Sequence, residues 1–174
     1  MTSTNKLTGT LAASLKWTET DTDDDTTTNT VIDDGVFNST QNWTSGVGSG
    51  EVDTVWHVVN TLSVSGAVEY DLTNLTRSLF NTSFVESFGK VKGLVLENLS
   101  TASGADISLT VTGVNAFVGP FISNTGNIQV PAKSPLAMGN YMFGWDVSAT
   151  SKFIQVNDTG GSGTKYRLAV IGIA

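Results

Sequence analysis

The run of residues 107–112 constrains the fold of this chain more than any other stretch of its sequence. Apolar Ile, Leu and Val alternate there with Ser and Thr, so the two kinds of side chain fall on opposite parities. A period of two is typical of a β-strand with one face in the core, and it does not fit a helix. We therefore predict a strand whose hydroxyl face is either solvent surface or part of an assembly interface.

The residues just before this strand form a second run with a different pattern. Between residues 90 and 98, Val91, Leu94, Val95 and Leu96 occupy both parities. Such a run is typical of a strand that is covered on both faces, inside a packed sheet. Small polar residues join the two runs, and we predict that residues 90–113 form a β-hairpin.

The composition extends the β assignment to the rest of the chain. Charged residues make up 14% of the 174 residues, against about 25% in typical proteins. Thr, Ser, Asn and Gly supply the polar surface and the turns, and turn signals recur roughly every 8–12 residues. We predict an all-β protein with a β-sandwich or jelly-roll-like body of about 8–10 short strands. The chain has no cysteine, which excludes disulfides and thiolate metal sites.

Prolines and the C-terminal run give two further expectations. Pro131 and Pro135 bracket a segment that should be an edge strand or a loop, because proline cannot donate to a β-ladder. The last run, residues 166–173, is apolar almost to its end, and we predict an inner strand.

One short helix is expected in this body. Leu72, Leu75 and Leu79 follow the helical spacing i, i+3, i+7, and Asp71, Thr73 or Asn74 could serve as the N-cap. We predict a helix of two turns that closes one end of the body.

The first part of the chain differs in charge from the remainder. Residues 1–55 carry nine acids and two bases, whereas residues 56–174 carry seven of each. Large apolar residues are sparse there, and Phe37 and Trp43 stand alone among polar neighbours. We expect two parts, an extended acidic N-terminal arm over 1–53 and a β-sandwich domain over 54–174. Two alternatives remain open for the arm: it docks on a neighbouring molecule, or residues 31–37 and 43–47 form a hairpin on their own domain.

The sequence contains few groups suited to catalysis. His57 is the single histidine and lies in a strand-like run, where a structural role is the more usual one. No Gly-x-Ser-x-Gly element supplies an activated serine, and no pair of carboxylates is singled out by spacing. We predict that the protein is not an enzyme and has no cofactor.

An acidic cluster in the arm resembles part of a calcium loop. Asp21, Asp23 and Asp25 stand at positions one, three and five, but Thr26 replaces the required Gly and Ile32 the bidentate Glu. We interpret the cluster as a solvated acidic loop, with no metal bound.

Other ligand classes find little support. The net charge of −7 and the scattered bases argue against nucleic-acid binding, and no apolar run reaches the length of a membrane span, about 20 residues. The four tryptophans, Trp17, Trp43, Trp56 and Trp145, are candidates to stack on sugars, although core packing is the more usual fate of tryptophan.

The run from Val91 to Asn98, the alternating strand after it, Pro131 and the terminal YRLAVIG strand together resemble small β-rich virion structural proteins of tailed bacteriophages. The resemblance extends from about residue 71 to the end. It implies a head decoration, or cement, protein on the capsid surface. The major capsid protein would be its partner, and the chain would be a homo-oligomer, with a trimer favoured at local threefold positions of the shell.

The composition agrees with this class of protein. Uncharged polar strands and an extended arm suit a subunit of a stable assembly. We therefore expect a non-enzymatic capsid decoration protein. The alternative is a carbohydrate-binding module of a phage tail or fibre, with exposed tryptophans as its sugar platform.

Overall fold

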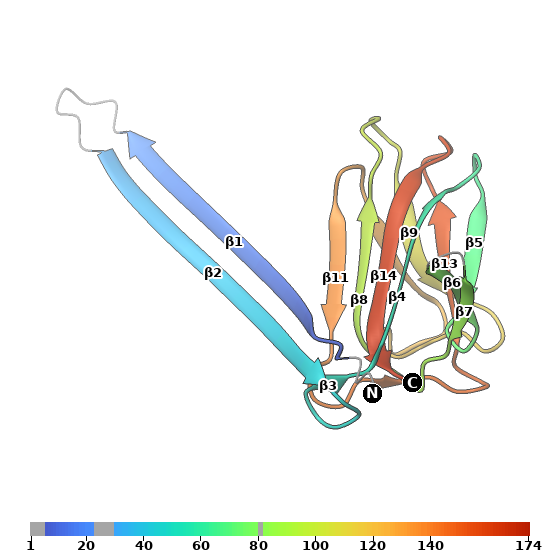
Figure 1. Ribbon diagram of the computed structural model, residues 1–174. Helices are drawn as coiled ribbons and strands as arrows, with labels where there is room; N and C mark the ends of the chain where they lie inside the picture. Colours follow the sequence, from blue (N-terminus) through green and yellow to red (C-terminus); the bar gives the residue numbers. More distant parts are fainter. Residues whose placement is uncertain (1–5, 23–29, 80–81) are drawn as a thin grey trace.

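The computed structural model describes residues 6–22, 30–79 and 82–174, and the regular structure in these residues is entirely β. Most strands belong to a body of two antiparallel sheets that face each other, and a long hairpin leaves this body at one end (Figure 1). The all-β prediction is confirmed.

The two facing sheets contain most of the strands. One sheet has the order β11-β8-β14-β4, with β12 also paired to β8, and the other has the order β10-β9-β13-β5. The bounds are β4 (Thr54–Thr61), β5 (Ala67–Asp71), β8 (Lys90–Asn98), β9 (Ile107–Val111), β10 (Gly126–Val130), β11 (Pro135–Gly139), β12 (Trp145–Asp146), β13 (Phe153–Asp158) and β14 (Lys165–Ile173).

Several strand positions agree with the sequence. β8 lies between β11 and β14, and β14 lies between β8 and β4, so both are inner strands as predicted. The segment between Pro131 and Pro135 is a turn, which is one of the two predicted alternatives, and the strand that follows it, β11, is an edge strand of its sheet. These positions follow from local patterns, namely apolar residues on both parities and a proline that cannot donate.

The predicted hairpin over residues 90–113 is wrong. β8 and β9 lie in different sheets, and the chain crosses from one sheet to the other between them. The buried Asn98 side chain holds this crossing: its Nδ2 donates to the carbonyls of Ala105 (2.7 Å) and Val130 (3.0 Å), and its Oδ1 accepts from the Ser100 N–H (3.0 Å). The backbone of β8 bonds to β11 and β14 and that of β9 to β10 and β13, so each strand finds its partners within its own sheet.

The predicted helix at Leu72, Leu75 and Leu79 is also wrong. Strand β6 (Leu75–Leu79) pairs with β7 (Thr82–Glu86) as a separate two-stranded sheet. Leu72 and Leu75 are both buried in the core. The leucine spacing matched a helix, but burial against the facing sheets, together with the ladder to β7, outweighed that local preference.

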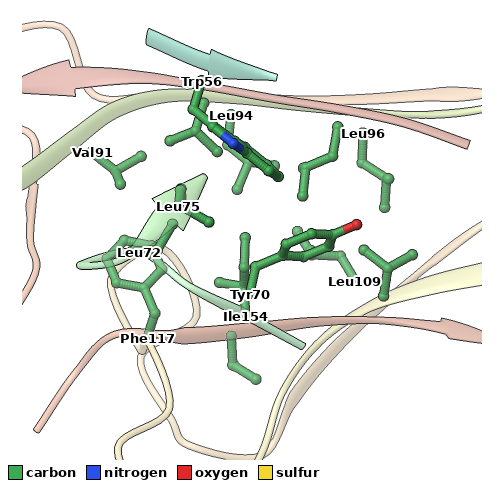
Figure 2. Close-up of a cluster of buried hydrophobic side chains, with 14 of the residues drawn as sticks. Trp56, Tyr70, Leu72, Leu75, Val91, Leu94, Leu96, Leu109, Phe117 and Ile154 are labelled. Carbon is green, nitrogen blue, oxygen red and sulfur yellow. The ribbon is translucent and has the colours of Figure 1, made fainter. Parts of the chain in front are cut away.

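A single hydrophobic core fills the space between the two sheets. Figure 2 shows Trp56, Leu94 and Leu96 from one sheet directed toward Tyr70 and Ile154 from the other. The Trp56 indole donates to the Thr76 carbonyl (3.0 Å) and packs edge-on against Tyr70. The core therefore joins both sheets and the β6–β7 ribbon into one body.

The N-terminal segment forms a long two-stranded hairpin. β1 (Gly9–Thr22) pairs with β2 (Thr30–Ser45) in continuous antiparallel register, and β2 continues through a short parallel pairing to β3 (Glu51–Val52). The hairpin diverges from the body toward its tip (Figure 1). The alternative in which residues 31–37 pair with 43–47 is wrong, because residues 31–37 and 43–45 belong to the same strand, β2, which pairs with β1 and β3.

One buried carboxylate, at the end of β13, joins the turn before β5 to the loop before β14. Asp158 accepts from the backbone N–H of Ser65 (2.9 Å) and Gly163 (3.0 Å). Burial by itself raises the pKa of Asp158, but these backbone donors outweigh it and hold the pKa below its ordinary value of 3.8.

This pKa gives a pH-dependent prediction. A carboxylate with a lowered folded-state pKa stabilises the fold above its unfolded pKa, and this contribution disappears as the pH falls through the folded value. We expect Asp158→Asn to cost about 1–3 kcal/mol at pH 7, and we expect the difference from wild type to shrink below pH 3.8. Urea unfolding of both proteins at pH 7 and pH 3 measures it. An unchanged difference at the two pH values contradicts the assignment.

Candidate functional site

The outer face of the β11-β8-β14-β4 sheet is largely apolar in the two rows nearest the hairpin base, where a solvent face is normally polar. The register places its outward residues in rows that run across the strands. The row nearest the hairpin base contains Gly139, Gly93, Ile171 and Val55; the next contains Ala137, Val95, Ala169 and His57; the third contains Pro135, Glu97, Arg167 and Val59.

The outer face of the other sheet provides the contrast. Its central row reads Asn127, Thr110, Gln155 and Glu69 across the strands. Asn157, in the neighbouring row, donates to the Thr110 hydroxyl (2.9 Å), so longer polar side chains cover the hydroxyls of β9. An antiparallel sheet with one solvated face normally shows such a polar row. The apolar rows of the first sheet therefore depart from the usual pattern of a solvent-facing sheet.

The base of the hairpin packs on the first of these rows. Trp43 is only 2% exposed, and a Cβ atom on Gly93 would lie 3.2 Å from its ring. A Cβ on Gly139 would lie 2.7 Å from Leu11. The two glycines thus leave room for the large side chains of the hairpin base, and the hairpin is anchored to the body there.

Beyond this anchor, an open cleft separates the hairpin from the sheet. It has a volume of about 190 Å³ and is lined by Leu11 and Trp43 from the hairpin and by Val55, Val95 and Ile171, among others, from the sheet. We call this space the hairpin cleft.

The two faces of the hairpin differ in chemistry. Residues directly opposite in an antiparallel pair share a face, and Leu11 and Trp43 show which face turns toward the cleft. Two and four residues further along, this face carries Ala13 and then Leu15 opposite Phe37; Leu15 is 62% and Phe37 59% exposed. Gln41 and Ser39 also lie on this face. On the other face, Thr10 bonds Asn42 and Ser14 bonds Asn38, but the exposed Val36 lies there too. Leu15 and Phe37 are therefore an uncovered apolar pair on the cleft side of the hairpin.

A buried lysine holds the two loops at the hairpin base together. In the ladder between β8 and β14, Gly93 pairs with Ile171 and Val91 with Gly172, so Lys92 is the extra residue of a β-bulge. Its Nζ donates to the carbonyls of Gly48 (2.9 Å) and Met142 (3.1 Å). Burial lowers the pKa of Lys92, with a further contribution from nearby Lys90.

These two loops present an exposed apolar cluster. Val47 is 69%, Met142 49% and Phe143 74% exposed, and all three line a shallow hollow of about 220 Å³ together with Lys92. We call these three residues the base patch. Because Lys92 binds both loops, it fixes them relative to each other, and the three side chains of the patch form one surface.

The structure places each of the candidate residues from the sequence. His57 lies on the outer face of β4, opposite Ala169. Trp43 and Trp56 are buried and Trp145 is partly buried, so these three do not form an open stacking platform; the side chain of Trp17 lies outside the described residues.

The acidic candidates fall into two groups. Asp23 and Asp25 lie outside the described residues, as does the side chain of Asp21. In the body, four carboxylates form ion pairs with bases on neighbouring segments. These pairs are Asp71 with Lys152, Glu86 with Arg77, Glu97 with Arg167 and Asp146 with Lys90.

Sequence reasoning missed both surfaces. The base patch comes from loops about 95 residues apart, which no local pattern connects. The apolar face of the hairpin was detectable, since Leu11, Leu15 and Trp17 share a parity, but their partners on β2 were not.

Within the described residues, no group of three His, Asp or Glu side chains is arranged to hold a metal ion. None of the described segments is a helix with the length and apolar character to cross a membrane. Comparison of the chain with protein-family models, with curated proteins and with solved structures finds no match.

Proposed function

We propose that this protein is a non-enzymatic virion structural protein, a capsid decoration protein that binds the outer surface of the major capsid shell. The observation that carries the proposal is the base patch, an exposed apolar cluster held in place by the buried Lys92. Apolar clusters that are exposed on a rigid surface are typical of protein–protein contacts.

The strand order supports a jelly-roll sandwich as the body. Counting the eight strands of the facing sheets along the chain from β4 to β14, without β6, β7 and β12, the two orders are 1-8-3-6 and 2-7-4-5. A pair of four-stranded sheets linked by Greek-key connections is the jelly roll, an architecture that occurs in viral capsid proteins and lectins. Because one fold can serve many unrelated functions, the base patch and not the jelly-roll order carries the proposed role.

The base patch gives the proposed contact its chemistry. Val47, Met142 and Phe143 provide apolar and aromatic anchors, and Met and Phe are enriched in protein interfaces. The patch lies at the end of the body where the hairpin is rooted, so a shell bound there leaves the hairpin cleft free. Capsid binding and contacts through the cleft can then be tested separately.

Co-sedimentation with shells of the major capsid protein tests the proposal. We expect wild-type protein to bind the shells and to raise the temperature at which they rupture. Phe143→Ser with Met142→Ser should weaken binding at least about tenfold and leave the melting temperature of the free protein unchanged, because both side chains are largely exposed.

Val114→Ser is the matched control, since Val114 is 84% exposed and lies outside the patch. It should bind like wild type. If the wild-type protein neither sediments with shells nor stabilises them, the decoration role is wrong.

A further inference from the structure

We propose that an open hollow between Tyr141 and strand β2 binds a neutral saccharide, with the Tyr141 ring as the stacking face. The hollow has a volume of about 350 Å³ and is lined by Thr40, Gln41, Asn42 and Tyr141. We call it the tyrosine hollow. This function goes beyond capsid decoration, because the hollow shares no residue with the base patch and its ligand requires no capsid.

The chemistry of the lining points to the class of ligand. The lining side chains provide one aromatic ring, one hydroxyl and two carboxamides. Hydroxyl and carboxamide groups both donate and accept hydrogen bonds, which matches the hydroxyl groups of a sugar. The ring offers an apolar face on which the C–H groups of a pyranose can pack. Ligand sites commonly combine aromatic surface with a few polar groups, in volumes of about 300–1,000 Å³.

Other classes of ligand match this lining less well. None of the described residues that line the hollow is an acid or a base, so a phosphate or a carboxylate finds no counter-charge. The net charge of −7 also repels anions. An apolar peptide side chain would have only the Tyr141 ring to pack on, and it would cover the polar groups without replacing their bonds to water. A neutral, hydroxyl-rich ligand avoids both costs.

The ring of Tyr141 is fixed in position. The Trp43 indole donates to the Tyr141 carbonyl (3.4 Å), and the two ring centroids lie 6.2 Å apart. The Tyr141 hydroxyl rests against Gly50, where a Cβ atom would lie 2.8 Å from Oη. Asn140 closes the loop by donating from Nδ2 to the Gly144 carbonyl (3.0 Å). Tyr141 is still 38% exposed, so a ligand can stack on it with little loss of conformational entropy.

Gln41 supplies an acceptor that lacks a donor. Its Oε1 is buried against Gly139, and no group in the described part of the chain donates to it. A buried oxygen without a donor is unfavourable. The residue as a whole is only partly buried, so a turn of its side chain brings the amide to a sugar hydroxyl in the hollow. The ligand then provides a hydrogen bond that the protein alone does not make.

Asn42 and Thr40 provide further polar groups from β2. Both residues are exposed, and they lie on the same face of the strand. The Thr10 hydroxyl donates to Asn42 Oδ1 (2.9 Å), which orients the amide. The Nδ2 of Asn42 lies on the other side of that amide, where it can donate to a ligand oxygen. Polar groups of β2 and the ring of the loop after β11 therefore converge on one space.

Saturation-transfer NMR on the purified chain tests the proposal. The neutral probes are methyl glucoside, methyl galactoside and N-acetylglucosamine, and glucuronic acid is the charged counterpart. We expect at least one neutral probe to bind with a Kd on the order of 1 mM, as suits a small ligand in an open hollow. Glucuronic acid should bind more weakly than that probe.

Two substitutions test the residues that carry the proposal. Tyr141→Ala should weaken saccharide binding at least about tenfold. Gln41→Met should weaken it about fivefold, while its melting temperature should be no lower than that of the wild type. Methionine keeps the side chain over Gly139 and removes the oxygen that has no donor. A merely structural role of Gln41 would instead lower the melting temperature and leave binding unchanged.

Phe143→Ala is the matched control. Phe143 is an exposed aromatic residue of the same loop and does not line the hollow. This variant should bind the saccharide like the wild type, although it removes part of the base patch. Equal losses for Phe143→Ala and Tyr141→Ala would contradict the assignment to the hollow.

Three further results overturn the saccharide site. They are no binding of any neutral probe at about 20 mM, tighter binding of glucuronic acid than of every neutral probe, and wild-type binding by both Tyr141→Ala and Gln41→Met. None of these measurements involves capsid shells, so the decoration role stands or falls by its own test.

Discussion

Replacing Trp43 with alanine is expected to lower the free energy of unfolding by about 3–5 kcal/mol. Trp43 is the main anchor of the hairpin: it is buried against Gly93, packs beside Tyr141 and donates from its indole N–H to the Tyr141 carbonyl (3.4 Å). Its removal leaves a cavity at the hairpin base. Denaturant unfolding measures the loss, and amide hydrogen exchange should show the protection of β1 and β2 falling more than that of β13.

Val47→Ala is the control for this variant. Val47 follows β2 closely and is exposed, so its truncation should change the stability by less than about 0.5 kcal/mol. If Trp43→Ala left both the stability and the protection of the hairpin unchanged, the hairpin would not be anchored as the structure places it.

Asn98→Ala is expected to cost about 2–4 kcal/mol, because two carbonyls and one N–H at the crossing between the sheets lose their partner while still buried. For a domain of this size such a loss lowers the melting temperature by roughly 4–16 °C. Asn98→Asp should be no better, since a carboxylate cannot donate to the carbonyls of Ala105 and Val130. Thermal unfolding followed by circular dichroism measures both.

Asn127→Ala is the matched control on the outer face of β10, where the side chain is exposed. It should melt close to wild type. Equal losses for Asn98→Ala and Asn127→Ala would mean that the crossing does not depend on the Asn98 amide.

β8 and β9 show what a local sequence pattern can predict and what it cannot. The alternation in β9 and the two-sided apolar run in β8 correctly indicated strands, because a period of two reports which side chains are buried. The pattern contains no information on which strand is the neighbour. Proximity in the sequence therefore predicts that the two runs pair, whereas in the structure they lie in different sheets and the Asn98 amide bonds the chain where it crosses.

The leucines around β6 show a second limit of local sequence patterns. Leu72 and Leu75 have the spacing of a helix, and a turn followed by a strand buries them equally well when the core is formed by residues distant in sequence. Local propensity is a weak prior where tertiary burial competes with it. The base patch could not be predicted from the sequence for the same reason, since Lys92, which holds it, looks like a surface residue in the sequence.

The sequence by itself determined that this chain is all-β, that β8 and β14 are inner strands, that the segment between Pro131 and Pro135 is an edge or a loop and that the acids gather in the N-terminal segment. These properties are local, because they depend on alternation, on proline and on composition. Only the tertiary structure decided that residues 9–22 and 30–45 pair as one projecting hairpin, that one sheet has largely apolar outer rows beside it, and that Lys92 joins two distant loops beneath the base patch. These properties depend on which strands become neighbours, and that is set by the burial and hydrogen bonding of the whole chain together.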